Sequence, residues 1–348
     1  MNTDILERLI EAYKASPPLF HTTSYWSAYE EPILLDLKNL DLNELRSGKY
    51  QSFKTFGFNE VIYSYPPGIP VVKKSLLKLI HKYIIGKKNI LPYGTGLDDL
   101  REVAFRHCEL YSELTGSRSI SSVEADKFGN PEDLFSINGK NYSVLFLNYY
   151  LRYCFANKHI RFKGNEVVVE LGSGSGHQVE ILKKLYPDLT ILCFDLPVEI
   201  WLAQLYLSEV FKNEQLVKLE ETINWNDLGG IRDGYIHFLG NWQMPLLFGK
   251  KFDLFWNAAS FGEMEPEVVK NYLKYVSGNA SWIYLLQARH GKQTKGKAHV
   301  QDPISFGDYI NFLDEYSLFE EKEAFNALQK IKHAGGYFEA IFRINKKI

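Results

Sequence analysis

Short apolar runs alternate with segments of helical periodicity through the second half of the chain. The runs are rich in Val, Ile, Leu and Phe and are bounded by Gly, Asn, Asp or Pro, which is typical of buried strands. The predicted strands span residues 166–171, 190–194, 235–239, 252–256, 281–286, 318–324 and 337–344. The predicted helices between them span residues 177–186, 198–211, 266–276 and 306–316. This alternation predicts an α/β fold with a mostly parallel seven-stranded sheet, helices on both faces and a final antiparallel pair at one edge.

The first part of the chain has a different pattern, with few strand signals. Helical periodicity recurs at residues 5–13, 36–45, 71–85 and 97–115, whereas residues 20–35 are aromatic and show no clear element. A further helix at residues 143–156 leads into the first strand of the sheet. We therefore expect two regions: a mainly helical region at residues 1–122 that covers a substrate pocket, and a domain built on the sheet at residues 123–348.

Three glycines at alternate positions, Gly172, Gly174 and Gly176, follow the first strand and precede a helix. A strand, a glycine-rich turn and a helix in this order open a nucleotide-binding α/β unit. The dinucleotide form of the motif needs a glycine three residues after the second one, and His177 stands there instead. The pattern is G-x-G-x-G preceded by the acid Glu170, and it resembles the first motif of Rossmann-like S-adenosylmethionine (SAM)-dependent methyltransferases.

Asp195 ends the second predicted strand, about twenty residues after the glycine loop, where an acid can bind the ribose of a nucleotide. A carboxylate suits that task because it accepts two hydrogen bonds side by side. Asp195 also precedes a helix with Pro197 in its first turn, so it equally fits an N-cap, and both roles can coexist. His177 and Gln178 open the helix after the glycine loop, where each can contact a ligand or serve the turn.

Composition and charge exclude several classes of protein. The chain has 348 residues, 45% of them hydrophobic, and a formal net charge of −2, which argues against a general nucleic-acid-binding surface. Three cysteines without paired spacing fit neither a disulfide framework nor a zinc site, and Cys193 is expected in the core. We find no signal peptide, no apolar run of membrane-spanning length and no convincing cluster of metal ligands. A cytoplasmic protein is therefore expected.

Polar residues follow each predicted strand, and the richest segment is residues 257–263 (NAASFGE) after the fourth strand. Methyl transfer to an oxygen requires an aligned acceptor and removal of its proton, so a His or carboxylate near a strand end is expected. Glu263 and His290 are the candidate bases, although Glu263 also fits a charge at the start of the next helix and His290 a solvated loop. His237 lies within an apolar strand and is expected in the core. A nearby loop contains three lysines, Lys292, Lys295 and Lys297. These lysines are either exposed to solvent or attract an anionic acceptor.

Several motifs together resemble the sugar O-methyltransferase family of bacteria. They occur at residues 124–142, 169–178, 194–197, 204–207 and 257–264, so the resemblance covers residues 120–290. It implies a Rossmann-like class I methyltransferase domain that binds SAM and methylates a sugar or glycan precursor for polysaccharide assembly. The expected cofactor-binding residues are Glu170, Gly172, Ser173, Gly174, Gly176, Gln178, Asp195, Leu196, Asn241, Trp242 and Asn257. The expected acceptor-binding residues are Asn130, Tyr142, Tyr149 and Ser260.

One departure from the broader methyltransferase pattern concerns adenine. An acid often follows the third strand to meet the adenine amino group, and here Asn241 or Trp242 stands in its place. Alternatives to a sugar methyltransferase are an enzyme acting on a non-sugar hydroxyl, a nicotinamide-dependent oxidoreductase and a catalytically silent SAM-binding protein. His177 in place of a glycine argues against the oxidoreductase. A homodimer is left open, and neither nucleic acid nor a membrane is expected as a partner.

Overall fold

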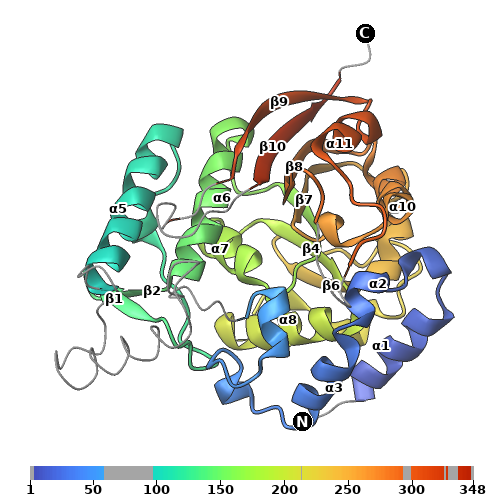
Figure 1. The fold of residues 1–348 in the computed structure, drawn as a ribbon, viewed down its shortest axis with the longest axis horizontal. Coiled ribbons are helices and arrows are strands. Elements are labelled where there is room, and N and C mark those ends of the chain that lie inside the picture. The colour runs from blue at the N-terminus through green and yellow to red at the C-terminus, as the bar shows by residue number, and fades with distance from the viewer. Residues whose placement is uncertain are drawn as a thin grey trace.

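An eight-stranded sheet lies at the centre of the computed structural model, which describes residues 4–58, 97–212, 214–292, 299–324, 327 and 336–345 (Figure 1). The strand order is β5-β6-β4-β3-β7-β8-β10-β9. The strands are β3 Val167–Leu171, β4 Thr190–Asp195, β5 Leu216–Val217, β6 Ile236–Gly240, β7 Phe252–Ala258, β8 Ala280–Ala288, β9 Tyr316–Glu323 and β10 Tyr337–Ile344. The six strands β3 to β8 are parallel to one another, and β10 is antiparallel to both of its neighbours.

The predicted α/β topology is confirmed with one addition. Each of the five apolar runs forms a parallel strand, and the last two strands pair at the edge with β10 between β8 and β9. The addition is β5, a two-residue strand that pairs with β6 and makes the sheet eight-stranded. It comes from residues 213–235, which also contain the short helix α9 Leu219–Thr222, and two residues are too few to show a periodicity in the sequence.

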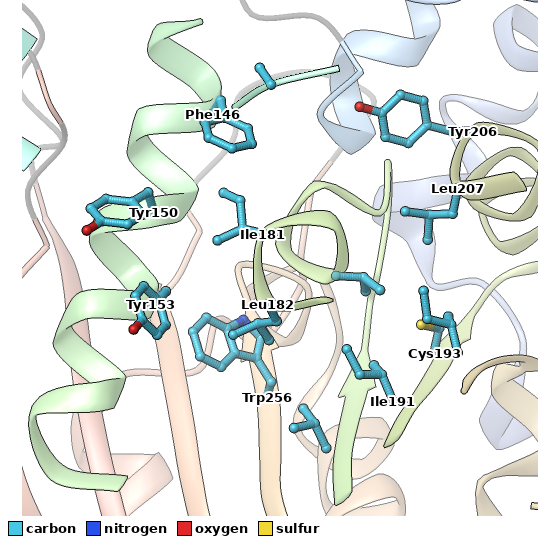
Figure 2. Packing of buried hydrophobic residues seen from close by; sticks show 14 of the residues in the cluster. Phe146, Tyr150, Tyr153, Ile181, Leu182, Ile191, Cys193, Tyr206, Leu207 and Trp256 are labelled. Carbon is cyan, nitrogen blue, oxygen red and sulfur yellow. The ribbon is translucent and has the colours of Figure 1, made fainter. Parts of the chain in front are cut away.

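Helices cover both faces of the sheet, so its strands are apolar on both sides. One face carries α6 Val144–Ile160, α7 His177–Leu185 and α8 Pro197–Val210, and the other carries α10 Pro266–Val276, α11 Phe306–Phe312 and η5 Asn241–Leu247. Alternate strand residues enter the two cores: Ile191 and Cys193 pack on the first face, and Leu192 packs on the second. Figure 2 shows Tyr150 of α6 and Leu182 of α7 in the first core. Cys193 is fully buried, as expected.

The N-terminal region is helical: α1 packs against α8, whereas the longer α5 packs against α6 (Figure 1). Its elements are α1 Asp4–Ala15, η1 Pro18–Phe20, α2 Ser24–Ser27, α3 Glu30–Lys38, η2 Leu42–Glu44, η3 Ser52–Phe56, α5 Leu97–Thr115 and η4 Ile120–Ser122. The helices expected at residues 5–13 and 97–115 are confirmed. The helix expected at residues 71–85 lies outside the described residues. None of the helices in the described ranges is both long and apolar enough to cross a bilayer.

Two expectations for the N-terminal region were wrong. Residues 20–35 are not irregular, because η1, α2 and the first part of α3 lie there. The helix expected at residues 36–45 is broken after Lys38, and a separate turn, η2, follows it. Two aspartates explain the break: Asp36 accepts hydrogen bonds from the backbone N–H and hydroxyl of Ser52, and Asp41 caps η2 through its contact with the N–H of Asn43.

A buried arginine joins the N-terminal region to the rest of the molecule. The guanidinium of Arg46 donates to the carbonyl of Asp126 at 2.9 Å and to the hydroxyl of Tyr206 at 3.1 Å. Tyr206 in turn donates to the carboxylate of Glu180 on α7 at 2.8 Å. The hairpin of β1 Phe135–Ile137 and β2 Lys140–Tyr142 lies near the start of the second region. These contacts fix the N-terminal region against the sheet domain, and the boundary at residue 122 stays a prediction.

Candidate active site

A cavity of about 300 Å³ lies between the carboxyl ends of the central strands and the N-terminal region. Its sheet side is lined by residues 170–174 at the end of β3, by Asp195 at the end of β4 and by Asn241 after β6. Residues 20–23 and 54–57 of the N-terminal region line the opposite side. The neighbours of β3 are β4 and β7, so the chain order reverses here, and such a switch point is where open α/β sheets bind ligands.

The glycine loop is closely packed, which explains two of its glycines. Gly172 has a φ of +81°, and an added Cβ would lie 2.5 Å from the hydroxyl oxygen of Ser260. Gly174 has a φ of +50°, and an added Cβ would lie 2.7 Å from the carbonyl oxygen of Phe56. Left-handed φ values and the lack of space both require glycine. Gly176 begins helix α7 and does not line the cavity.

Asp195 receives two backbone hydrogen bonds at the cavity wall. Its Oδ2 accepts from the N–H of Gly174 at 2.7 Å, and its Oδ1 accepts from the N–H of Leu196 at 2.8 Å. Burial raises the pKa of Asp195 to about 6, in spite of these two donors. Leu196, not Asp195, is the N-cap of α8, and it also lines the cavity. Each carboxylate oxygen of Asp195 keeps a further lone pair for a ligand.

Two buried acceptors without a donor lie on the same wall. The Oε2 atom of Glu170 has no partner within the described residues, and burial raises the pKa of this carboxyl to about 8. Asn241 donates its amide to the carbonyl of Phe20 at 2.6 Å and to the hydroxyl of Tyr272 at 2.7 Å, and its Oδ1 has no partner among the residues that the structure describes. Buried polar atoms normally have partners, so these two oxygens indicate a ligand with donor groups.

Glu263 lies at the other end of the cavity, in the turn η6 Phe261–Glu263. It forms an ion pair with Lys292, whose ammonium lies 4.3 Å from the ring centre of Tyr25. The hydroxyl of Thr23 donates to the backbone carbonyl of Glu263 at 2.8 Å. Burial raises the pKa of Glu263 although Lys292 opposes this change. Helix α10 starts only at Pro266, so Glu263 is not its N-cap.

The histidines are placed differently from one another. His290 is exposed and does not line the cavity. His237 is buried in β6 and accepts the N–H of Arg232 at 3.0 Å, and burial lowers its pKa to about 4, which confirms it as a core residue. His177 is buried between the rings of Tyr149 and Tyr206, so it supports the loop from behind.

Several expected site residues are brought to the cavity and others are not. Ser173, Tyr149 and Ser260 line it. Asn257 lies behind the wall, where its amide donates to the carbonyl of Leu171 at 2.9 Å and ties β7 to β3. The residues that the structure places away from the cavity lining are Gln178, Trp242, Asn130 and Tyr142.

The reasons for these placements are local. Tyr142 is buried among aromatic rings, next to Phe105 and Phe146. Asn130 is exposed, and its side-chain amide donates hydrogen bonds to the carboxylate of Glu44. Trp242 packs edge-on to the ring of Tyr13 at 5.9 Å. Gln178 is buried, and neither amide atom has a hydrogen-bond partner in the described part of the chain. Of the expected lysine cluster, Lys292 turns inward to Glu263, and Lys295 and Lys297 lie outside the described residues.

Sequence reasoning missed some of the residues that line the cavity. Trp26 and Phe56 lie in short turns without periodicity, so no signal in the sequence identified them. Arg152 on α6 precedes the first strand by several turns of helix. Glu199 had a usable signal, because it is an acid in the first turn of the helix that follows the strand ending at Asp195. In the part of the chain that the structure describes, no group of three or more His, Cys, Asp or Glu side chains could hold a metal ion.

The central segment of the chain matches a known protein family. A family model described as an O-methyltransferase domain matches residues 150–222, which contain most of α6, the glycine loop and Asp195. No protein of curated function matches the sequence.

Solved structures are similar at a distance. The mitomycin 7-O-methyltransferase shares 10% identity at a TM-score of 0.38, with 57% of each chain covered, so the match spans little more than half of that enzyme. A SAM-dependent methyltransferase from Aquifex aeolicus shares 17% identity at a TM-score of 0.35, with 55% of this chain and 87% of that chain covered. The magnesium protoporphyrin IX methyltransferase from Synechocystis, solved with bound SAH, shares 10% identity at a TM-score of 0.38, with 79% and 95% covered.

The fold is the Rossmann-like α/β fold of class I methyltransferases, with a helical N-terminal region. The glycine loop and Asp195 lie at the switch point of its sheet, within the matched segment. Over residues 150–222, which contain these features, the chain is similar to O-methyltransferase domains.

Proposed function

We propose that the chain methylates a hydroxyl of a sugar or glycan precursor, with SAM bound on the sheet side of the cavity and the acceptor under the N-terminal region. One observation carries the proposal most directly. The cavity combines unpartnered buried acceptors beside the glycine loop with a buried carboxylate, Glu263, at its other end. When bound, SAM supplies an electrophilic methyl group on a positively charged sulfur. The cavity then needs only to hold an oxygen nucleophile in line with that methyl group.

The cofactor half of the site follows from donor and acceptor chemistry. Asp195 accepts a hydrogen bond from the ribose, and Glu170 accepts the ammonium group of the methionine end, for which its free Oε2 is suited. The free Oδ1 of Asn241 accepts the adenine amino group, the role that an acid often fills in related enzymes. The remaining contacts come from the loop backbone at residues 172–174 and from Leu196. Four residues act from behind the wall, by holding its elements in place: Gly176, Gln178, Trp242 and Asn257.

The acceptor half is aromatic and lies under the N-terminal region. Trp26, Phe56 and Tyr149 line it, and Ser260 adds a hydroxyl. Sugars present apolar C–H faces that pack on aromatic rings, together with hydroxyls that need polar partners. This composition supports a sugar acceptor and a covering role for residues 1–122. Asn130 and Tyr142 lie away from the cavity, so the proposed acceptor site does not use them.

Glu263 is the proposed base for the hydroxyl proton. It lines the cavity, is desolvated and is held in place by Lys292, whereas His290 is exposed and outside the lining. Burial raises its pKa toward neutral pH, which brings a carboxylate closer to the range where it removes a proton effectively. The Lys292 charge keeps Glu263 ionised enough to accept that proton.

The experiment that tests this function follows a tritiated methyl group from SAM to a panel of acceptors. The panel contains nucleotide-linked hexoses, methyl glycosides and catechol as a non-sugar hydroxyl. We expect label in the sugar fraction, as an ether that resists mild base. Transfer to catechol alone would replace the sugar acceptor with a non-sugar one. SAM binding without transfer to any acceptor, at a hundredfold range of concentrations, would instead support a silent SAM-binding protein.

A further inference from the structure

Glu199 is a buried carboxylate in the cavity that the proposed function does not use. It lies in the first turn of α8, four residues after Asp195, and only 4% of its surface is exposed. No side chain within the described residues donates a hydrogen bond to it, and its own backbone N–H is its one donor. A carboxylate buried without a cation or several donors is costly to the folded state. Its retention in the cavity wall therefore suggests that a ligand supplies the donors.

The surroundings of Glu199 add further negative charge. The charged groups that act on it are Asp195, Glu263 and Glu30, all of them carboxylates, and burial together with Asp195 raises its pKa to about 8. Neighbouring groups stabilise the negative charge of the other three cavity acids. Asp195 accepts from two backbone N–H groups, Glu263 pairs with Lys292, and the positive charge of Arg152 acts on Glu170. Among the described residues, no side-chain donor supports Glu199.

Glu199 lies beside Asp195 on the cavity wall. Asp195 ends β4, Leu196 caps α8, and Glu199 stands in the first turn of that helix, and all three residues line the cavity. The charge of Asp195 reaches Glu199 and contributes to its raised pKa. In the proposed cofactor position, the part of SAM next to Asp195 is the ribose, so Glu199 is close to the ribose as well.

We propose that Glu199 is a second ribose ligand, which accepts one of the two ribose hydroxyls while Asp195 accepts the other. This rests on the proposed cofactor position. The oxygens of Asp195 already accept one backbone N–H each, so a second carboxylate gives each hydroxyl an acceptor of its own. The paired acids make the site selective for a ribose with both hydroxyls present.

The test measures the affinity of the full chain for SAH and for its 2′-deoxy and 3′-deoxy analogues by calorimetry. The variants are Glu199→Ala and Glu199→Gln, with Glu209→Ala as the matched control, because Glu209 is an exposed acid on the same helix. We expect Glu199→Ala to weaken SAH binding about tenfold or more and to leave the affinity for one deoxy analogue nearly unchanged. Glu199→Gln should keep part of the affinity, since its amide oxygen still accepts. Glu209→Ala should match the wild type.

The outcomes separate this inference from the function on which it rests. Wild-type binding of SAH with no effect of Glu199→Ala, or an equal loss for SAH and both deoxy analogues, would overturn the ribose role alone. Failure of the wild type to bind SAH would overturn the proposed cofactor site and the inference with it. A loss of SAH binding in Glu199→Ala would not come from unfolding, because removal of a buried acid without side-chain partners should leave the thermal unfolding temperature unchanged or raise it.

Discussion

Replacing Gly174 with alanine tests how the N-terminal region and the glycine loop fit together. Gly174 has a φ of +50°, and a Cβ added there would lie 2.7 Å from the carbonyl oxygen of Phe56. The obstructing atom belongs to the backbone, so it cannot rotate away as the end of a side chain could. Either the loop or the segment at residues 52–58 must move to accept the methyl group.

The magnitude follows from two separate costs. A left-handed φ costs an L-residue roughly 1–2 kcal/mol, and forcing an extra carbon against packed atoms costs about 1–3 kcal/mol. The free energy of unfolding should therefore fall by about 2–5 kcal/mol. The N–H of Gly174 also donates to Asp195 at 2.7 Å, so displacement of the loop disturbs this proposed ribose ligand. SAM affinity should fall at least about tenfold, which corresponds to about 1.4 kcal/mol.

Urea denaturation and calorimetric titration with SAM measure the two effects. The control is Gly139→Ala, because Gly139 has a φ of +78° and nothing within 4 Å of an added Cβ. That variant should show only the conformational cost of roughly 1–2 kcal/mol and normal SAM binding. If Gly174→Ala is no more destabilising than the control and binds SAM as the wild type does, the proposed contact between Phe56 and the loop is wrong.

Three further predictions concern the carboxylates of the cavity. Asp195→Ala should weaken SAM binding by about 1.5–3 kcal/mol in a calorimetric titration, because a charged acceptor is lost, and an unchanged affinity would remove Asp195 from the ribose site. Glu263→Gln should lower turnover by ~10²–10⁴-fold at unchanged SAM affinity in a methyl-transfer assay, whereas His290→Ala should keep wild-type turnover; the reverse result would make His290 the base. Glu170 has its pKa raised from 4.5 to about 8, so the folded state holds a proton that the unfolded state has lost between these pH values. The free energy of unfolding should thus fall across that window by at most about 1.4 kcal/mol per pH unit for this group, and Glu170→Gln should flatten the fall in thermal unfolding curves. A variant that follows the wild-type pH profile would show that Glu170 titrates normally.

The sheet and its glycine loop could be predicted from sequence because their signals are local. Strands buried on both faces read as continuous apolar runs, and β3, β4 and β7 each begin within one residue of the predicted start. The loop and Asp195 are separated by a fixed strand–helix unit, so their spacing alone brings them together. The structure shows that contact directly, as the hydrogen bond from Gly174 to Asp195.

The other side of the cavity could not be predicted, because long-range packing determines it. Trp26 and Phe56 lie in turns too short for a periodic pattern and are held by contacts with distant parts of the chain. Lys292 had the appearance of a solvated lysine in a basic loop, and only the fold brings it to Glu263. Tyr142 was expected in the acceptor site, but it lies in the hairpin of β1 and β2 and is buried in the core.

The central claim is that the cavity binds SAM at the glycine loop. Calorimetric titration of the full chain with SAM, and separately with NAD, tests it most directly. We predict one-site binding of SAM that Asp195→Ala weakens and Glu209→Ala does not, with no heat from NAD. Binding of NAD without any response to SAM would contradict the claim.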